Sequence, residues 1–110
     1  MTPEKAAESI REKAPLYGRA KGLRTHLEEF RRVQKAILMK EALTKGMEAA
    51  NAQEREALAD PEYKRLIKQL ADAIEEEETL KWELESHRLD IEIWRTRQAS
   101  ERLQIRSHEE

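Results

Sequence analysis

The apolar residues of this chain recur at helical spacings along two long stretches. In the first stretch the intervals are mostly four and three residues, and the stripe positions are Leu16, Ala20, Leu23, Leu27, Phe30, Gln34, Ile37 and Leu38. Successive residues of a helix are about 100° apart, so positions with these intervals share one side of it. The pattern predicts an amphipathic helix over residues 16–45.

Capping residues divide the first half of the chain. Thr2-Pro3-Glu4 is typical of a helix start, because threonine caps the first turn and proline suits the first helical position. This signal predicts a short helix over residues 3–14. We expect Pro15 to end that helix, because proline disfavours helical geometry in the residue before it. Lys45-Gly46 indicates the end of the first long helix.

The second half of the chain has two further start signals. Asn51-Ala-Gln-Glu54 resembles a capping box and predicts a short helix over residues 52–59. Asp60-Pro61-Glu62 combines a capping acid with proline at the first helical position. It predicts a second long helix over residues 61–106.

The two long helices are expected to form an antiparallel, coiled-coil-like hairpin within a single all-α domain, since a short connection favours antiparallel neighbours. Basic residues dominate from Arg19 to Lys40, and acidic residues dominate from Asp72 to Glu92. Folding the chain back around residues 46–60 would place these opposite charges beside the seam. The connection itself is compatible with a rigid turn or a hinge.

The second long helix is apolar on two sides. Leu80, Leu84, His87, Ile91 and Trp94 share one face, whereas Trp82, Leu89 and Ile93 lie roughly opposite. A helix of this kind must be covered on both sides, and a two-helix hairpin has little core of its own. We therefore expect a homodimer, assembled as a helical bundle in either orientation. The expected interface residues are Trp82, Leu84, His87, Leu89, Ile91, Ile93 and Trp94.

Composition supports long solvated helices. Charged residues make up 40% of the chain, against about 25% in an average globular protein. The chain has no cysteine, which excludes disulfides and thiolate metal sites. No apolar run is long enough to span a membrane, and the chain does not begin like a signal peptide, so a cytoplasmic location is expected.

The sequence carries no motif for catalysis. The three histidines lack an HExxH arrangement, and there is no glycine-rich phosphate loop. We expect no enzyme activity, no cofactor and no metal site. His87 interrupts the apolar stripe, and a hydrogen-bonded core histidine is favoured there over a pH-sensitive interface residue or a ligand.

Two clusters of charge suggest alternative functions. An antiparallel hairpin is expected to bring the last arginines near residues 11–21, which would make one end basic and attractive to phosphates. The possible nucleic-acid contacts are Arg11, Arg19, Lys21, Arg24, Arg95, Arg97, Arg102 and Arg106. These residues are alternatively only solvating. The preferred interpretation of the run Glu75–Glu78 is a solvated acidic face beside the first long helix, and the alternative is mimicry of DNA.

Several short segments carry a resemblance to a known group of proteins. They are Lys40-Glu41-Ala42, Gln53 to Ala57, Asp60 to Tyr63, Glu75 to Glu78 followed by Trp82, and Ile93-Trp94-Arg95. Over most of residues 27–103 the chain resembles uncharacterised small helical proteins encoded by bacteriophages and prophages, sometimes in recombination gene regions. The resemblance implies a phage accessory protein in a bacterial cytoplasm.

The leading functional hypothesis is a non-enzymatic helical interaction protein, a dimeric adaptor or modulator acting on DNA transactions. One alternative is direct binding of DNA or RNA through the basic end. Another is an acidic DNA mimic that inhibits a host protein.

Overall fold

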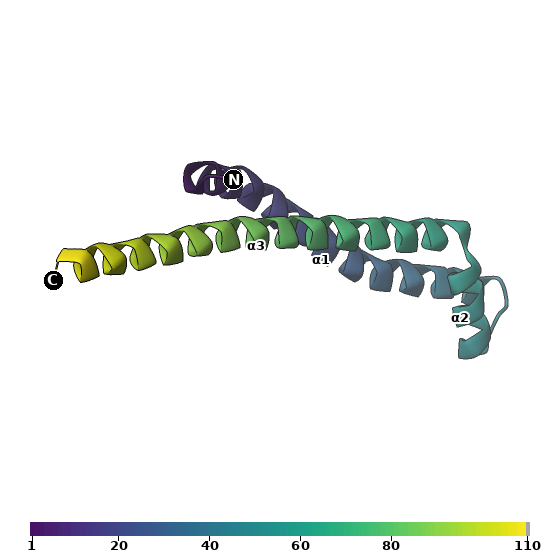
Figure 1. Cartoon of the computed structure of the whole chain (residues 1–110). Coiled ribbons are helices and arrows are strands. Elements are labelled where there is room, and N and C mark those ends of the chain that lie inside the picture. Colours follow the sequence, from purple (N-terminus) through teal and green to yellow (C-terminus); the bar gives the residue numbers. More distant parts are fainter. Residues whose placement is uncertain (110) are drawn as a thin grey trace. The chain divides into compact units, whose positions relative to one another are not determined.

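A computed structural model describes residues 1–109, which form three α-helices and no strand (Figure 1). The helices are α1 (Pro3–Thr44), α2 (Ala50–Ala59) and α3 (Pro61–Glu109). The chain divides into two compact units. Unit 1 contains residues 1–18 and the segment from residue 78 onward, and unit 2 contains residues 19–77. The predicted all-α fold built on two long helices is therefore confirmed.

Helix α1 begins as predicted but does not break at Pro15. The backbone N–H of Lys5 donates to Thr2 Oγ1 over 3.2 Å, and that of Ala6 donates to the Thr2 carbonyl over 2.9 Å. The predicted helices 3–14 and 16–45 are one continuous helix, so the expected break was wrong. Proline lacks an N–H, which removes the hydrogen bond to the carbonyl of Arg11. Neighbouring turns that pack against α3 keep the helix continuous across this gap.

A left-handed glycine ends α1 where the sequence indicated. Gly46 has φ of +104°, and its N–H donates to the carbonyl of Leu43 over 3.0 Å. The N–H of Met47 donates to the carbonyl of Ala42, also over 3.0 Å. These two bonds form a Schellman motif, which satisfies carbonyls that the helix end leaves free.

Helix α2 starts earlier than predicted. It begins at Ala50 after Ala49, whose side chain makes no capping hydrogen bond. Asn51 Oδ1 accepts from the N–H of Ala52 inside the first turn, so the predicted capping box was wrong. The Gln53 side chain instead donates to the carbonyl of Met47 over 2.9 Å, which fastens the connection to the helix.

Helix α3 begins at the predicted cap. Asp60 Oδ1 accepts from the N–H of Glu62 over 2.8 Å and from that of Tyr63 over 3.4 Å. These contacts satisfy donors that the first turn leaves free. The helix continues to Glu109, three residues beyond the predicted end.

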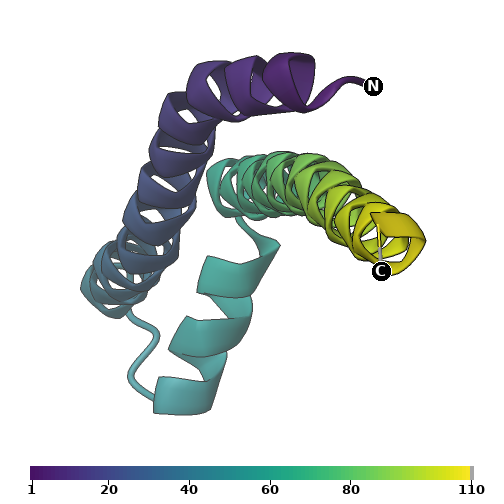
Figure 2. The same cartoon turned by 60° about the vertical axis from the view of Figure 1, so that its left-hand side comes forward.

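The core of unit 2 lies between antiparallel stretches of α1 and α3, with α2 at their connection (Figures 1 and 2). Leu27 packs in one buried cluster with Leu66, Leu70 and Ala73. Leu38, Ala57 and Tyr63 form a second buried cluster, against which Met39 packs. Later residues of α1 thus meet earlier residues of α3. The predicted hairpin is confirmed in this unit.

Only some residues of the apolar stripe predicted for α1 are buried. Ala20, Leu27 and Leu38 are buried. The stripe residues that stay between 41% and 52% exposed are Leu16, Leu23, Phe30 and Ile37. On the same side of α1 as the buried residues, the half-buried Arg24 pairs with Glu77 across the helices.

In unit 1 the start of α1 packs against the middle of α3. Lys13 forms an ion pair with Glu83. Ile10 and Tyr17 line a shared hollow with Leu84 of α3. From residue 92 to residue 109 every side chain of α3 except Gln98 is exposed. Within the described chain, nothing in unit 1 covers this last stretch of helix.

Candidate interaction surface

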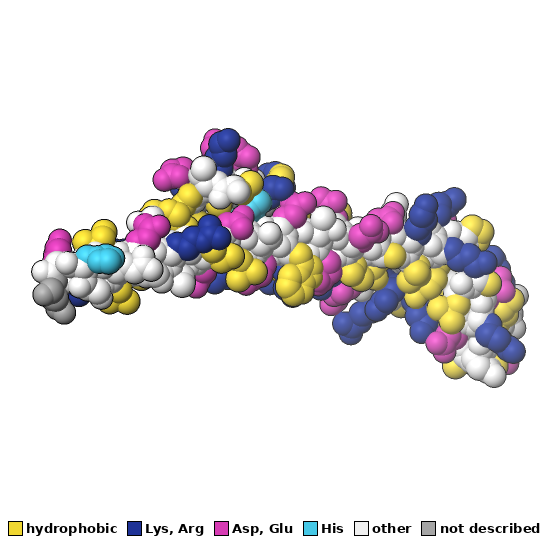
Figure 3. Space-filling model, in the orientation of Figure 1, with side chains coloured by type: hydrophobic (Ala, Val, Ile, Leu, Met, Phe, Trp, Pro, Cys, Tyr) yellow, Lys and Arg dark blue, Asp and Glu magenta, His cyan; other side chains and the backbone are white. Residues whose placement is uncertain are grey.

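The outer side of α3 in unit 1 exposes a row of large apolar side chains. Trp82 is 61% exposed, Leu89 53%, Ile93 50% and Leu103 63%. Leu80, on the other face, is buried. Both faces predicted for this helix are therefore present. In the view of Figure 3, apolar side chains interrupt the charged surface along α3.

Two neighbours hold the Trp82 side chain. Its indole Nε1–H donates to Glu78 Oε2 over 3.2 Å. Lys81 Nζ lies 5.3 Å from the ring centroid, within the range of a cation–π contact. The largest side chain of the row thus has a defined position although most of it is in contact with solvent.

The seven predicted interface residues fall on different sides of α3. Leu84, His87 and Ile91 are half-buried and continue the side that faces α1. The other four, Trp82, Leu89, Ile93 and Trp94, are exposed. Trp94 was predicted to share the face of Leu84 and does so by spacing, but it is 43% exposed. It belongs to the stretch of α3 beyond the start of α1.

His87 was expected to be a hydrogen-bonded core histidine, and the hydrogen bond is missing. The side chain is half-buried, and its Nδ1 is buried without a partner in residues 1–109. Buried polar atoms are usually paired, so this nitrogen is an exception within the single chain. No three potential metal-ligating side chains converge anywhere in the described part of the chain.

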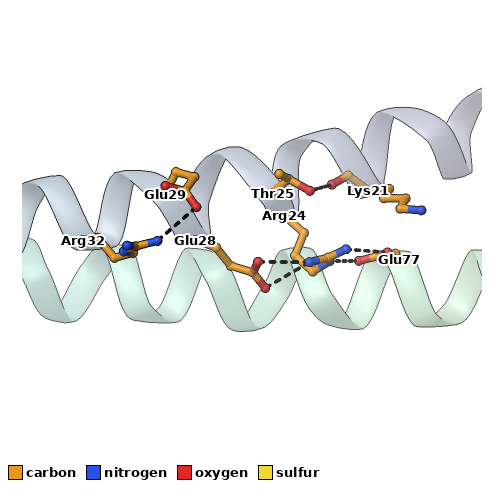
Figure 4. Close-up of polar contacts among 7 residues, drawn as sticks. All are labelled: Lys21, Arg24, Thr25, Glu28, Glu29, Arg32 and Glu77. Atoms are coloured by element: carbon orange, nitrogen blue, oxygen red, sulfur yellow. Dashed lines mark hydrogen bonds and ion pairs between the residues drawn. The ribbon is translucent and has the colours of Figure 1, made fainter.

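A polar layer crosses the seam of unit 2 (Figure 4). Arg24 donates to Glu77 through Nε and Nη2, and Nη1 lies 3.0 Å from Glu28 Oε1. The carboxylate of Glu77, and after it that of Glu28, raises the pKa of the Arg24 guanidinium above its ordinary value. The predicted pairing of opposite charges across the seam is therefore found at Arg24. This arginine is engaged within the fold and is a poor nucleic-acid contact.

The glutamate run does not form one acidic surface. Glu77 is buried and paired with Arg24, while Glu78 accepts from Trp82. Glu75, Glu76 and Glu78 remain exposed, and none of the three forms an ion pair among residues 1–109. Mimicry of DNA by this run stays a prediction.

The predicted basic end is not assembled as expected. Ile10, Ala14 and Tyr17 line a hollow with α3 residues between 81 and 88, and Lys13 pairs with Glu83. The start of α1 therefore faces an earlier part of α3 than the last arginines. The reason is the register of the two helices: Lys13 lies at Glu83, and the ten residues of α1 before Lys13 can reach only to about residue 93 of α3. Arg11, Arg19 and Lys21 are exposed, as are Arg95, Arg97, Arg102 and Arg106.

An exposed apolar row on α1 in unit 2 was not predicted from the sequence. Leu23, Phe30, Val33 and Ile37 are each at least 41% exposed. A hollow beside this row is lined by Leu23 and Leu27 from α1 and by Gln69, Asp72, Ala73 and Glu76 from α3. The seven-residue repeat of Leu23, Phe30 and Ile37, offset from the buried positions, was the available signal.

None of the described helices has a stretch long and apolar enough to cross a membrane. The phage resemblance suggested by the sequence stays a prediction. No protein-family model matches this chain, and neither does any of the curated proteins or solved structures compared with it.

Proposed function

We propose that this chain is a non-enzymatic helical interaction protein that works as a homodimer. The observation that carries the proposal is the outer row of α3, in which Trp82, Leu89, Ile93 and Leu103 are all at least half exposed. Monomeric proteins rarely expose contiguous apolar patches larger than a few hundred Å². A row of this kind on an otherwise charged helix is typical of a surface that another helix covers.

The exposed area supports the same proposal. More large apolar side chains are exposed than apolar side chains are buried, so association would supply core that one chain lacks.

The mass of the protein in solution tests this proposal. Sedimentation or light scattering at micromolar concentrations should give twice the chain mass of 12.9 kDa. A single species of 12.9 kDa across that range would refute the dimer.

A second candidate function is binding of nucleic acid through α3. Arg95, Arg97, Arg102 and Arg106 are exposed, and none forms an ion pair with any carboxylate of residues 1–109. Unpaired arginines on one helix segment attract phosphates, and such binding weakens steeply as salt rises. This candidate would connect the dimer to DNA transactions.

Fluorescence anisotropy with labelled single- and double-stranded DNA tests the second candidate. Binding that persists at near-physiological salt, and is lost in the double variant Arg95→Glu/Arg102→Glu, would support it. Arg55→Glu/Lys68→Glu is the matched control, because it makes the same two charge reversals at exposed sites of unit 2. Equal affinity in all three proteins would exclude α3 as the binding surface.

A further inference from the structure

The outer row of α3 includes small polar residues as well as its large apolar ones. Nine exposed positions follow one another at strictly alternating intervals of three and four: Thr79, Trp82, Ser86, Leu89, Ile93, Thr96, Ser100, Leu103 and Ser107. None of the nine is charged, whereas eleven of the other twenty residues between 79 and 107 are. If these positions only faced solvent, charged residues would be expected among them as often as elsewhere on the helix. Alternation of three and four is the spacing of a coiled-coil seam.

The charges beside this row change sign along the helix. Heptad spacing places acids next to the first half of the row, namely Glu78, Glu83, Glu85, Asp90 and Glu92. The same flanking positions in the second half hold Arg97 and Arg106. Two parallel copies would set acid against acid, while two antiparallel copies set the acidic half of one against the basic half of the other. Flanking charges choose the orientation of paired helices in this way.

Resting on the proposed dimer, we infer that a second copy of this chain packs along this row in antiparallel orientation. The two-fold axis passes between Leu89 and Ile93. Such an axis makes the interface isologous, because each half of the row meets the other half of its counterpart.

Side-chain size favours this position of the axis. Leu89 then faces Ile93 of the second copy, and the large Trp82 faces the small Ser100 of the second copy. Facing large and small residues interdigitate without voids. Glu83 comes near Arg97 of the second copy and Glu78 near its Arg106. Like charges meet only close to the axis.

Disulfide trapping tests the orientation, and the chain offers a clean background because it has no cysteine. Ser86 and Thr96 are both exposed, and the axis places each opposite the other in the second copy. Ser86→Cys mixed with Thr96→Cys, exchanged under reducing conditions and then oxidised, should give a linked dimer. Neither variant should link to itself. Glu101→Cys, on the opposite side of α3, is the control and should stay unlinked.

The possible outcomes separate this inference from the proposed function. Self-linking of Ser86→Cys would mean a parallel pair and would overturn the inference. A protein of dimeric mass that forms no link between positions 86 and 96 would also overturn it, while the proposed dimer stands. A monomeric mass under reducing conditions would overturn both. Helix content measured by circular dichroism confirms that each variant is folded before oxidation.

Discussion

Replacing Leu89 and Ile93 with glutamine should dissociate the dimer. Fully burying one leucine or isoleucine side chain contributes about 1.5–3 kcal/mol. These two are 53% and 50% exposed in the single chain, so association can bury about half of each. The two changes in one chain then remove about 1.5–3 kcal/mol of association free energy. A symmetric dimer loses about 3–6 kcal/mol, because both copies carry the changes. At about 1.4 kcal/mol per factor of ten, the dissociation constant should rise by about 10²–10⁴.

Sedimentation equilibrium over a concentration series measures this shift. The matched control is Ile67→Gln/Ile74→Gln, which makes the same chemical change at two exposed positions of α3 in unit 2. The control should retain the dissociation constant of the unaltered protein. Circular dichroism should show equal helix content in all three proteins, since every altered side chain is exposed. If Leu89→Gln/Ile93→Gln associates as tightly as the unaltered chain, the outer row is not the interface.

Three single substitutions test the account of the fold. Leu70→Ala should lower the free energy of unfolding by about 2–5 kcal/mol, because Leu70 is 4% exposed in the cluster around Leu27. An unchanged urea midpoint would contradict that packing. Pro15→Ala should raise the thermal midpoint by restoring a backbone donor, with a gain of up to about 3 kcal/mol, and a fall would show that the proline itself stabilises α1. Gly46→Ala should lower the free energy of unfolding by about 1–2 kcal/mol in urea, because φ is +104° at this position. No neighbouring atom lies within 4 Å of the added carbon, so the loss would come from the backbone alone. An unchanged urea midpoint would mean that the turn adopts another conformation.

Local signals in the sequence predicted the helix ends well. Thr2, Gly46 and Asp60 act through hydrogen bonds to residues within five positions of themselves, so their effect is readable without knowledge of the fold. The capping box predicted at Asn51 was wrong because such a motif needs its first residue outside the helix. Helix α2 begins at Ala50, one residue before Asn51. The two faces of α3 were also predictable, since periodicity alone separates Leu80 from Trp82.

Tertiary packing decided what the sequence left open. Pro15 is a strong local signal for a helix break, yet contacts such as that of Lys13 with Glu83 hold the helix on the side before it. The rotation of α1 about its axis was likewise not fixed by hydrophobicity. The sequence pattern of Arg24 is that of a surface residue, but Arg24 pairs with Glu77 across the helices while Leu23 is exposed.

The contrast between the two sides of α3 links folding to association. The side facing α1 includes the buried Glu77 and the Nδ1 of His87, which has no hydrogen-bond partner among residues 1–109. A buried polar group can fix the register of two helices at a cost in stability. The outer row has no charge and no such cost, but nothing in the described chain covers it. The side facing α1 thus carries the polar groups of the fold, while the outer row is apolar surface that association would cover. Because a partner that binds only the folded chain stabilises it by mass action, a second copy on that row would supply stability that the side facing α1 does not.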